Sequence, residues 1–284
     1  MLKVLQVLVL TAVMQRTTRA FSWALRKQGF KSLHCRVQSG PYLPSLTSTR
    51  PASSLASSLA SSEFTNHLKD VATLRNEYFA LRHGQSLANV AGIIASDPSV
   101  ACSKYGLSDL GKEQAALAGN QLVRQYQNKA NKTSSTLSRQ GVAIVTSDLL
   151  RAKETAQSVA DAVLAAGLPL FNDDVVIDAR LRERGFGKWD GGSDEHYGDV
   201  WKVDAVDPSH TIQGVESVLS VTDRATKCVI EWDMKLDNHW IVCVAHGDVL
   251  QILQTAFSKM DPSQHRSLDH LETATLRPLI LGGS

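Results

Sequence analysis

The sequence predicts an α/β protein, a three-layer αβα sandwich with a mostly parallel central sheet. Two observations indicate this fold. Short apolar runs alternate with segments of helical apolar spacing from about residue 66 onward, and polar residues follow directly after three of those runs. Strands that alternate with helices form parallel sheets covered on both faces, and ligands bind beyond the carboxyl ends of such strands.

Five apolar runs have the length of buried strands. The first is Tyr-Phe-Ala-Leu at 78–81, which ends at Arg82. The other predicted strands are residues 141–147, 175–178, 240–245 and 275–281. Runs of this length that are bounded by turn residues are typical of strands buried on both faces.

Three helices are predicted from apolar spacing and from end signals. Ser108 has the side chain of an N-cap residue, and Gly167 is a plausible residue just after a helix end. The first helix is expected to bury a face made of Leu110, Leu117, Ala118 and Leu122. The buried positions of the other two are predicted to be Ala152, Ala156, Val159 and Val163, then Val249, Ile252, Leu253 and Ala256.

Residues 1–65 are predicted to be a leader and residues 66–284 the folded domain. No Asp or Glu occurs before Glu63, and the leader is rich in Arg and Ser. This composition is typical of a transit peptide, so we expect a mitochondrion or plastid, with the cytoplasm as the alternative. The apolar run near Met1 is too short to span a bilayer, so no membrane contact is expected of the mature form.

The charge and the cysteines exclude several classes of protein. The formal net charge is +2, but the basic surplus belongs to the leader, and the rest is slightly acidic. That balance argues against a nucleic-acid partner. The four cysteines form no CxxC pair and no metal-like spacing, so we expect ordinary thiols in a reducing compartment and no cofactor or metal.

Two histidines and two arginines are expected to meet at one edge of the sheet. The first strand is followed by Arg82 and His83, and the run at 240–245 is followed by His246. Arg151 lies on the first turn of the helix after residues 141–147. Since the carboxyl ends of parallel strands share an edge, these four side chains should converge there.

This set of side chains suits phosphoryl chemistry. Arg offers a planar, permanently charged fork for phosphate oxygens. A neutral imidazole is nucleophilic, and its ordinary pKa of about 6.5 leaves it available near neutrality. A helix start just after His83 would aim backbone N–H groups at an anion, while Gly84 and Gly247 would let backbone approach a ligand closely.

The segment Leu81-Arg82-His83-Gly84-Gln85-Ser86, with Asn89, resembles the RHG signature of the histidine phosphatase superfamily, also called phosphoglycerate mutase-like. Five further motifs resemble that family in the same order. They are Leu107-Ser108-Asp109-Leu110-Gly111 with Gln114-Ala115, Ser147-Asp148-Leu149-Leu150-Arg151-Ala152, Leu181-Arg182-Glu183 with Gly187 and Trp189, Gly214-Val215-Glu216-Ser217, and Ala245-His246-Gly247. Gln85 stands where many members have Glu, a position that tolerates both.

The resemblance implies a role for each matched residue. His83 would form a phosphohistidine. Arg82, Arg151 and His246 would bind the phosphoryl oxygens, with Asn89 and Gly247 nearby. Glu183 would act as the acid and then as the base, with its pKa raised by burial against Phe186 and Trp189. Asp248 is the rival acid, and an ordinary salt bridge to Arg182 or Arg184 is the alternative role for Glu183.

The family resemblance favours a phosphomonoester hydrolase for a small phosphorylated metabolite or a phosphoprotein. A phosphoglycerate mutase-type isomerase is less favoured, because little chain remains to seal the site from water. Less favoured still are a metal-dependent hydrolase and a non-catalytic phospho-ligand binding module. Residues 180–215 and 95–105 are expected to cover the site and select the substrate. The sequence leaves the leaving group and the oligomeric state open.

Overall fold

The structure is a computed structural model, and it describes residues 64–132 and 140–282. The predicted leader, residues 1–65, lies almost wholly outside the described residues. Where the described chain begins, the backbone N–H of Thr65 donates to Oδ1 of Asp223 over 3.1 Å. The chain is thus attached to the domain from that residue onward.

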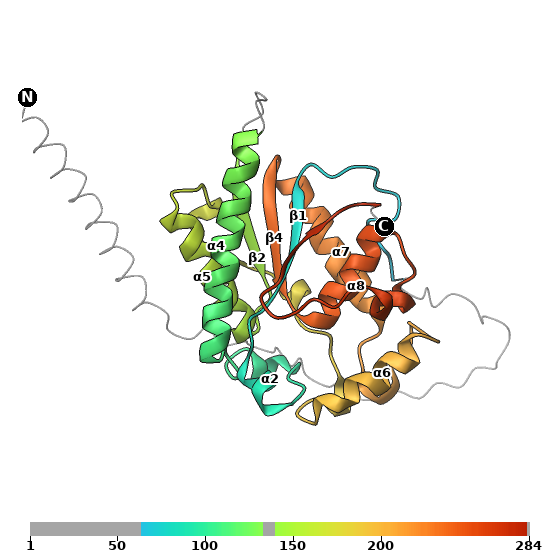
Figure 1. Cartoon of the computed structure of the whole chain (residues 1–284). Coiled ribbons are helices and arrows are strands. Elements are labelled where there is room, and N and C mark those ends of the chain that lie inside the picture. The colour runs from blue at the N-terminus through green and yellow to red at the C-terminus, as the bar shows by residue number, and fades with distance from the viewer. Residues whose placement is uncertain (1–63, 133–139, 283–284) are drawn as a thin grey trace, which may run out of the picture. The chain divides into compact units, whose positions relative to one another are not determined.

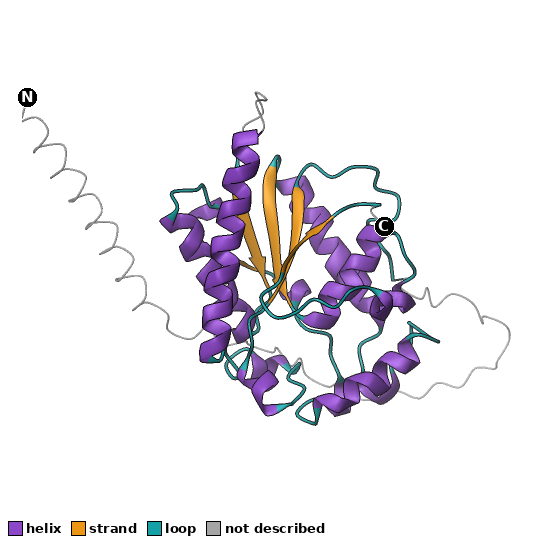
Figure 2. Cartoon of the chain, in the orientation of Figure 1, coloured by secondary structure: helices purple, strands orange, loops and turns teal. Residues whose placement is uncertain are grey.

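The described residues form a five-stranded sheet. Its strands are β1 (Glu77–Arg82), β2 (Gly141–Thr146), β3 (Val176–Ile177), β4 (His239–Ala245) and β5 (Leu276–Leu279). The spatial order is β3-β2-β4-β1-β5, and only β5 runs antiparallel to its neighbour (Figure 2). The mostly parallel sheet is therefore confirmed. Strand β3 is shorter than predicted, because only its two residues pair with Val145 and Thr146 of β2.

Two helices cover each face of the sheet. They are α4 (Asp109–Lys132) and α5 (Leu150–Ala165) on one face, α7 (Val218–Lys235) and α8 (Gly247–Ser258) on the other (Figure 1). Alternate strand residues enter the two cores: Tyr78 and Ala80 pack with α7 and α8, whereas Phe79 and Leu81 pack with α4 and α5. This is the predicted three-layer sandwich. No helix of the described segments is long and apolar enough to cross a bilayer.

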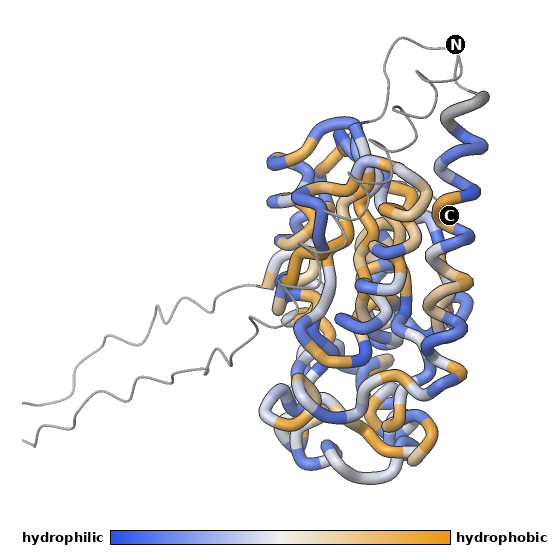
Figure 3. The backbone as a smooth tube through the Cα atoms, turned by 90° about the vertical axis from the view of Figure 1, so that its left-hand side faces the viewer, coloured by the Kyte–Doolittle hydropathy of each residue, from blue (hydrophilic) through white to orange (hydrophobic). Residues whose placement is uncertain are grey.

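The apolar face predicted for α4 is partly wrong. Ser108 caps the helix as expected, since its Oγ accepts from the N–H of Gly111 over 3.0 Å. Leu122 is buried, but Leu110 and Leu117 are 50% and 65% exposed. Successive helical residues are about 100° apart, so these two leucines lie to one side of the buried stripe. In Figure 3, α4 is the mostly hydrophilic helix at the right edge.

Small residues hold the buried stripe of α4 because this helix packs closely on α5. A Cβ atom at Gly119 would lie only 2.8 Å from a side-chain carbon of Ala162. The apolar faces predicted for α5 and α8 are confirmed, since all eight of their named residues are fully buried. Gly167 also follows α5 in the left-handed conformation, with φ of +70°.

Short elements gather beyond the carboxyl ends of the strands. They are α2 (Leu87–Ala91), α3 (Pro98–Ala101), α6 (Tyr197–Asp204) and short 3-10 turns at Ala179–Leu181, Gly187–Trp189, Asp194–His196, Ile212–Gly214 and Pro262–Ser267 (Figure 1). A further turn, Phe171–Asp173, lies at the other end of the sheet, where Phe171 contacts His239 at the start of β4. The two segments predicted to cover the site are joined beyond the carboxyl ends of the strands. The N–H of Phe186 donates to Oγ of Ser96 (3.1 Å), and that hydroxyl donates to Oδ1 of Asp190 (2.7 Å).

The described cysteines are ordinary free thiols, as expected. Cys228 and Cys243 are buried in one core, and Cys102 is half-buried. Burial raises the pKa of the Cys243 thiol to about 12, so this sulfur stays protonated and acts as a small apolar group. The fourth cysteine, Cys35, lies outside the described residues.

Candidate active site

The convergence of side chains at the edge of the sheet is confirmed. His83 follows β1, and its backbone N–H donates to the carbonyl of Ala245 at the end of β4 (3.0 Å). The rings of His83 and His246 lie 5.1 Å apart, centroid to centroid. Arg151, on the first turn of α5, reaches His83 from the end of β2, where its Nε donates to Nε2 of the ring over 3.1 Å.

The hydrogen bonds of His83 define its protonation. Its Nδ1 lies 2.7 Å from the carbonyl oxygen of Gly84, which can only accept, so Nδ1 carries the proton. Nε2 accepts from Arg151 and is therefore unprotonated. Burial lowers the pKa of His83 well below its usual value, and the charges of Arg151 and Arg82 lower it further. The ring thus presents a nucleophilic nitrogen at neutral pH.

Three buried nitrogens around His83 have no hydrogen-bond partner among the described residues. They are Nε of Arg82, Nη1 of Arg151 and Nδ1 of His246. A buried polar group without a partner costs roughly 1–3 kcal/mol, and more when it is charged. Two of these donors are guanidinium nitrogens, so a dianionic phosphoryl group is the chemistry that would satisfy them.

Ser147 sets the orientation of the second histidine. The Oγ of Ser147 accepts from the N–H of Leu149 (3.2 Å) and lies 2.8 Å from Nε2 of His246. This hydroxyl has no other acceptor among the described residues, so it donates to Nε2 and leaves the ring proton on the unpartnered Nδ1. Burial and the charge of Arg151 lower the pKa of His246 well below its usual value. A neutral ring that donates from Nδ1 can bind a phosphoryl oxygen.

Glu183 is buried at the same site, only 8% exposed. Burial, and then the negative charge of Asp248, raise its pKa to about 7 despite the opposing charge of Arg151. Burial was predicted to be the cause, and Phe186 lies in the adjacent apolar cluster. The contribution of Asp248 to this pKa was not predicted. A carboxyl group that keeps its proton near neutrality can act as a general acid.

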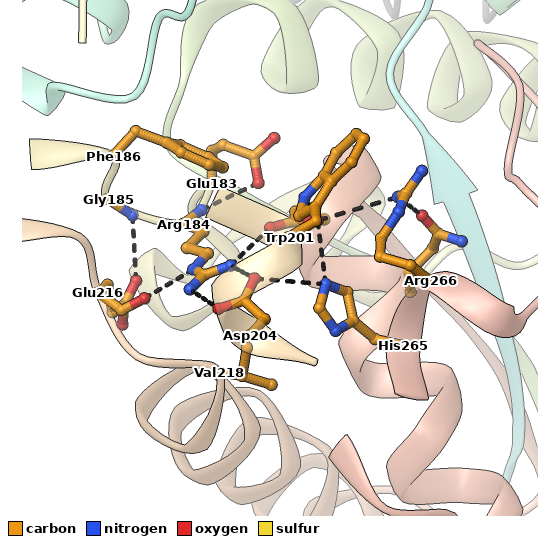
Figure 4. A network of polar contacts seen from close by, with 12 residues as sticks. Glu183, Arg184, Gly185, Phe186, Trp201, Asp204, Glu216, Val218, His265 and Arg266 are labelled. Atoms are coloured by element: carbon orange, nitrogen blue, oxygen red, sulfur yellow. Dashed lines mark hydrogen bonds and ion pairs between the residues drawn. The ribbon is translucent and has the colours of Figure 1, made fainter. Parts of the chain in front are cut away.

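The contacts disagree with the alternative roles of these acids. Arg182 pairs with Asp148, and Arg184 makes a fully buried bidentate pair with Asp204 at 2.6 and 2.7 Å (Figure 4). Neither arginine therefore neutralises Glu183 by an ion pair. Asp248 accepts from Arg184 Nη1 (3.2 Å) and from the indole N–H of Trp201 (2.9 Å), so both of its oxygens are engaged by other groups.

The contacts of Gly84, in the loop after β1, correct the role predicted for this glycine. A Cβ at Gly84 would lie 2.4 Å from the carbonyl oxygen of Gly111, so this glycine is needed for contact with α4 and not for the approach of a ligand. Gln85 is tied to the same helix, since its N–H donates to Oε1 of Gln114 (2.8 Å). Asn89 lies on α2, and its Oδ1 accepts from the N–H of Ser86 (3.0 Å) in a capping box.

A small cavity of about 90 Å³ lies over these groups. Six of the seven predicted site residues line it, namely Arg82, His83, Asn89, Arg151, Glu183 and Gly247, and His246 lies buried behind His83. Asp248 and Ala95 also line it. A larger apolar cavity, of about 770 Å³, lies at the other end of the sheet near Trp240, and it contains none of the predicted site residues.

The lining residues that were not predicted from the sequence include four with aromatic or charged side chains or an imidazole: Tyr197, Trp201, Arg266 and His270. Tyr197 and Trp201 are spaced i, i+4 on α6, and their rings stack at 5.5 Å. Two aromatic residues at i, i+4 spacing, inside the segment predicted to cover the site, are the sequence feature from which this pair could have been predicted. Arg266 and His270 follow α8 in a segment without periodicity. His270 lies 2.8 Å from Nη1 of Arg82 through its Nε2.

The fold and the site together define a phosphatase-type α/β enzyme. The sequence model of the histidine phosphatase superfamily (branch 1) matches residues 78–282, and the chain belongs to this family.

The chain is similar to two known phosphatases. It is 32% identical over 190 residues to the glucosyl-3-phosphoglycerate phosphatase of Mycolicibacterium vanbaalenii, a match that covers 62% of this chain and 71% of the relative. A solved mycobacterial glucosyl-3-phosphoglycerate phosphatase in complex with VO3 is 26% identical and has a TM-score of 0.55. That match covers 72% of this chain and 90% of the other.

A third neighbour supports the fold alone. It is a mutant phosphoserine phosphatase from Entamoeba histolytica in complex with phosphoserine, 22% identical with a TM-score of 0.53. The match covers 72% of this chain and 89% of that one. The family and the curated relative together support phosphatase activity for this chain.

Proposed function

We propose that the protein hydrolyses phosphomonoesters of small metabolites through a phosphohistidine at Nε2 of His83. One observation carries the proposal: the unprotonated Nε2 lies among three buried donors without a partner in the described part of the chain, on Arg82, Arg151 and His246. The names of the mycobacterial relatives support a small phosphorylated metabolite as the substrate. They also favour hydrolysis over the relocation of the phosphoryl group.

In the first step, the substrate phosphoryl group takes its place among these donors. Arg151, which donates to His83 over 3.1 Å, turns its hydrogen bond to a phosphoryl oxygen and frees the lone pair of Nε2. That lone pair forms the bond to phosphorus as the bond to the ester oxygen breaks. Glu183, protonated because its pKa is about 7, gives its proton to the departing oxygen.

In the second step, water breaks the bond between phosphorus and Nε2. The carboxylate of Glu183 takes a proton from the attacking water, so the acid is regenerated. The electron pair of the broken bond returns to the ring of His83, and inorganic phosphate leaves. The guanidinium groups of Arg82 and Arg151 stabilise the charge on the transferring oxygens in both steps.

The test is a rapid-quench experiment with the full chain and p-nitrophenyl phosphate. We expect a phosphoenzyme that is labile to acid and stable to base, formed at the rate of the first turnover. His83→Ala is expected to lose both the phosphoenzyme and the steady-state rate. His67→Ala, which removes a half-buried histidine paired with Asp223, is the matched control and is expected to keep both. The proposal would be overturned if His83→Ala kept the full rate. It would also be overturned if wild type turned over the substrate without any phosphoenzyme being trapped.

A further inference from the structure

One peptide group, the one that joins Gly84 to Gln85, accepts the ring proton of His83. Its carbonyl oxygen lies 2.7 Å from Nδ1 of the ring. A carbonyl oxygen can only accept, so the position of this peptide decides which ring nitrogen carries the proton. While the carbonyl faces Nδ1, the other nitrogen, Nε2, keeps a lone pair for phosphorus.

The peptides on either side of this one are held by other parts of the chain. The N–H of Gly84 belongs to the preceding peptide and donates to Oγ1 of Thr155, on α5, over 3.0 Å. The carbonyl of Gln85 belongs to the following peptide and accepts from the N–H of Ser108 over 2.9 Å. These contacts fix both ends of the loop after β1, but neither involves the peptide that faces His83.

Gln114 holds that peptide from its other side. Oε1 of Gln114 accepts from the N–H of Gln85 over 2.8 Å. Among the described residues, this side chain and the ring of His83 are the only hydrogen-bond partners of the Gly84–Gln85 peptide. Since the N–H and the carbonyl of a planar trans peptide point in opposite directions, a contact at the N–H also fixes the direction of the carbonyl.

Gln114 is itself held in place, because its helix packs on the loop. It is half-buried on the second turn of α4, and the next residue, Ala115, is fully buried. A Cβ atom at Gly111, one turn earlier, would collide with the carbonyl oxygen of Gln85. The backbones of the helix and the loop are therefore in direct contact, and the acceptor oxygen comes from a rigid element.

We propose that Gln114 is a positioning residue, which acts through the Gly84–Gln85 peptide to keep the ring proton of His83 on Nδ1. Without this acceptor, the N–H of Gln85 loses its partner, and the peptide is free to rotate toward water. The carbonyl then leaves Nδ1, and the ring proton can move to Nε2. A nitrogen that carries the proton has no lone pair with which to attack phosphorus. This inference rests on the proposed function, since it takes His83 as the nucleophile.

The test compares Gln114→Met, which removes the acceptor and keeps the length of the side chain, with Gln114→Glu, which keeps an acceptor oxygen. With the full chain and p-nitrophenyl phosphate, phosphoenzyme formation in Gln114→Met is expected to slow by about 10-fold, as for the loss of one hydrogen bond. Gln114→Glu should stay within about threefold of wild type, since its oxygen still accepts. Gln127→Met, on the exposed side of α4, is the control and should keep the wild-type rate.

Inorganic phosphate tests the donors without the nucleophile. It should inhibit wild type and Gln114→Met with constants that agree within about threefold, because Arg82, Arg151 and His246 are unchanged.

The position of the ring proton separates positioning from a general loss of structure. NMR of the ring nitrogens, with the signals of His83 assigned by their loss in His83→Ala, distinguishes Nδ1–H from Nε2–H. Wild type and Gln114→Glu are expected to carry the proton on Nδ1. Gln114→Met is expected to show a measurable share of Nε2–H.

Three outcomes would overturn the proposal. The first is a phosphoenzyme that forms at the wild-type rate in Gln114→Met, and the second is a slower rate with the ring proton still on Nδ1. The third needs no variant, and is a wild-type ring that carries its proton on Nε2. Gln114→Ala gives the same comparison if urea unfolding shows that Gln114→Met does not fold. A failure of the proposed function is seen separately, because wild type itself would then form no phosphoenzyme.

Discussion

Arg151 donates a hydrogen bond from Nε to Nε2 of His83 over 3.1 Å, while its Nη1 is buried without a partner in the described part of the chain. The same guanidinium therefore both holds the imidazole unprotonated and leaves one donor for a ligand. A lysine would not do both, because its ammonium group is a point charge on a flexible side chain. In a guanidinium the donors are fixed in one plane.

We expect Arg151→Lys to lower kcat for p-nitrophenyl phosphate by about 10²–10³-fold, the usual effect of losing one donor to the transition state. Because lysine keeps the positive charge, the pKa of His83 should stay low. The loss of rate would then come from the missing donor and not from protonation of the ring. Steady-state kinetics, with urea unfolding as a check on folding, measures this. Arg124→Lys on the exposed side of α4 is the control. A rate within threefold of wild type would contradict the role of the fork.

Glu183→Gln should slow poor leaving groups more than good ones. The ester oxygen of glycerol 3-phosphate needs a proton as it leaves, whereas p-nitrophenolate is stable without one. We expect kcat/KM to fall by about 10²–10⁴-fold for glycerol 3-phosphate and by much less for p-nitrophenyl phosphate. This ratio reports only steps up to ester cleavage, so the later role of Glu183 with water does not enter. Equal slowing of both substrates would move the acid role to another group.

The strands and the phosphoryl donors could be predicted because local pattern determines both. A buried strand of a parallel sheet is an apolar run, and the residue after it lies at the carboxyl edge, so Arg82 and His246 were placed without knowledge of any contact. Leu110 and Leu117 were predicted to be buried, but both are exposed. Periodicity alone does not separate two apolar stripes of a helix that are about 100° apart.

The wall of the cavity could not be predicted, because it depends on tertiary contacts. Arg266 and Trp201 are 65 positions apart in sequence (266 minus 201), and only the stacking of their side chains brings them together. Arg184 adjoins Glu183 in sequence, yet its guanidinium lies on Asp204 and Asp248. A charge pattern along the chain does not reveal which of several carboxylates an arginine reaches.

Asp248→Asn should move the pH profile to lower values. The negative charge of Asp248 raises the pKa of Glu183, so its removal lowers that pKa from about 7. Because the first step needs protonated Glu183, kcat/KM for glycerol 3-phosphate falls as pH rises through this pKa. The fall should therefore begin at lower pH in the variant. Asp199→Asn, on the exposed side of α6, should leave the profile in place. An unmoved fall in Asp248→Asn would contradict the coupling.

Arg184→Met should unfold the protein more easily by about 3–5 kcal/mol, because Asp204 and Asp248 would be left buried without their cation. Replacing Asp204 with Asn in the same chain should restore part of the loss. Arg180→Met is the matched control, since Arg180 makes partly exposed pairs and should cost less than about 1 kcal/mol. Urea unfolding measures all three. Equal costs for Arg184 and Arg180 would contradict the importance of burial.

Glu183→Gln should stabilise the protein at pH 8 and have little effect at pH 5. The pKa of Glu183 is about 7 in the folded chain and 4.5 in its ordinary state, so the folded chain binds this proton more tightly. Stability is therefore lost as pH rises from about 4.5 to about 7, by up to about 3 kcal/mol, and stays lost above that. Gln imitates the protonated acid and cannot ionise, so it avoids the loss.

Urea midpoints at the two pH values measure this effect, with the exposed Glu195→Gln as the control. A stabilisation that is equal at pH 5 and pH 8 would show that shape, and not ionisation, is responsible. A gain at pH 8 alone, together with the slower cleavage of glycerol 3-phosphate, would mean that one buried carboxyl group both destabilises the fold and performs the proton transfer. The instability would then be a direct consequence of keeping the acid protonated near neutrality.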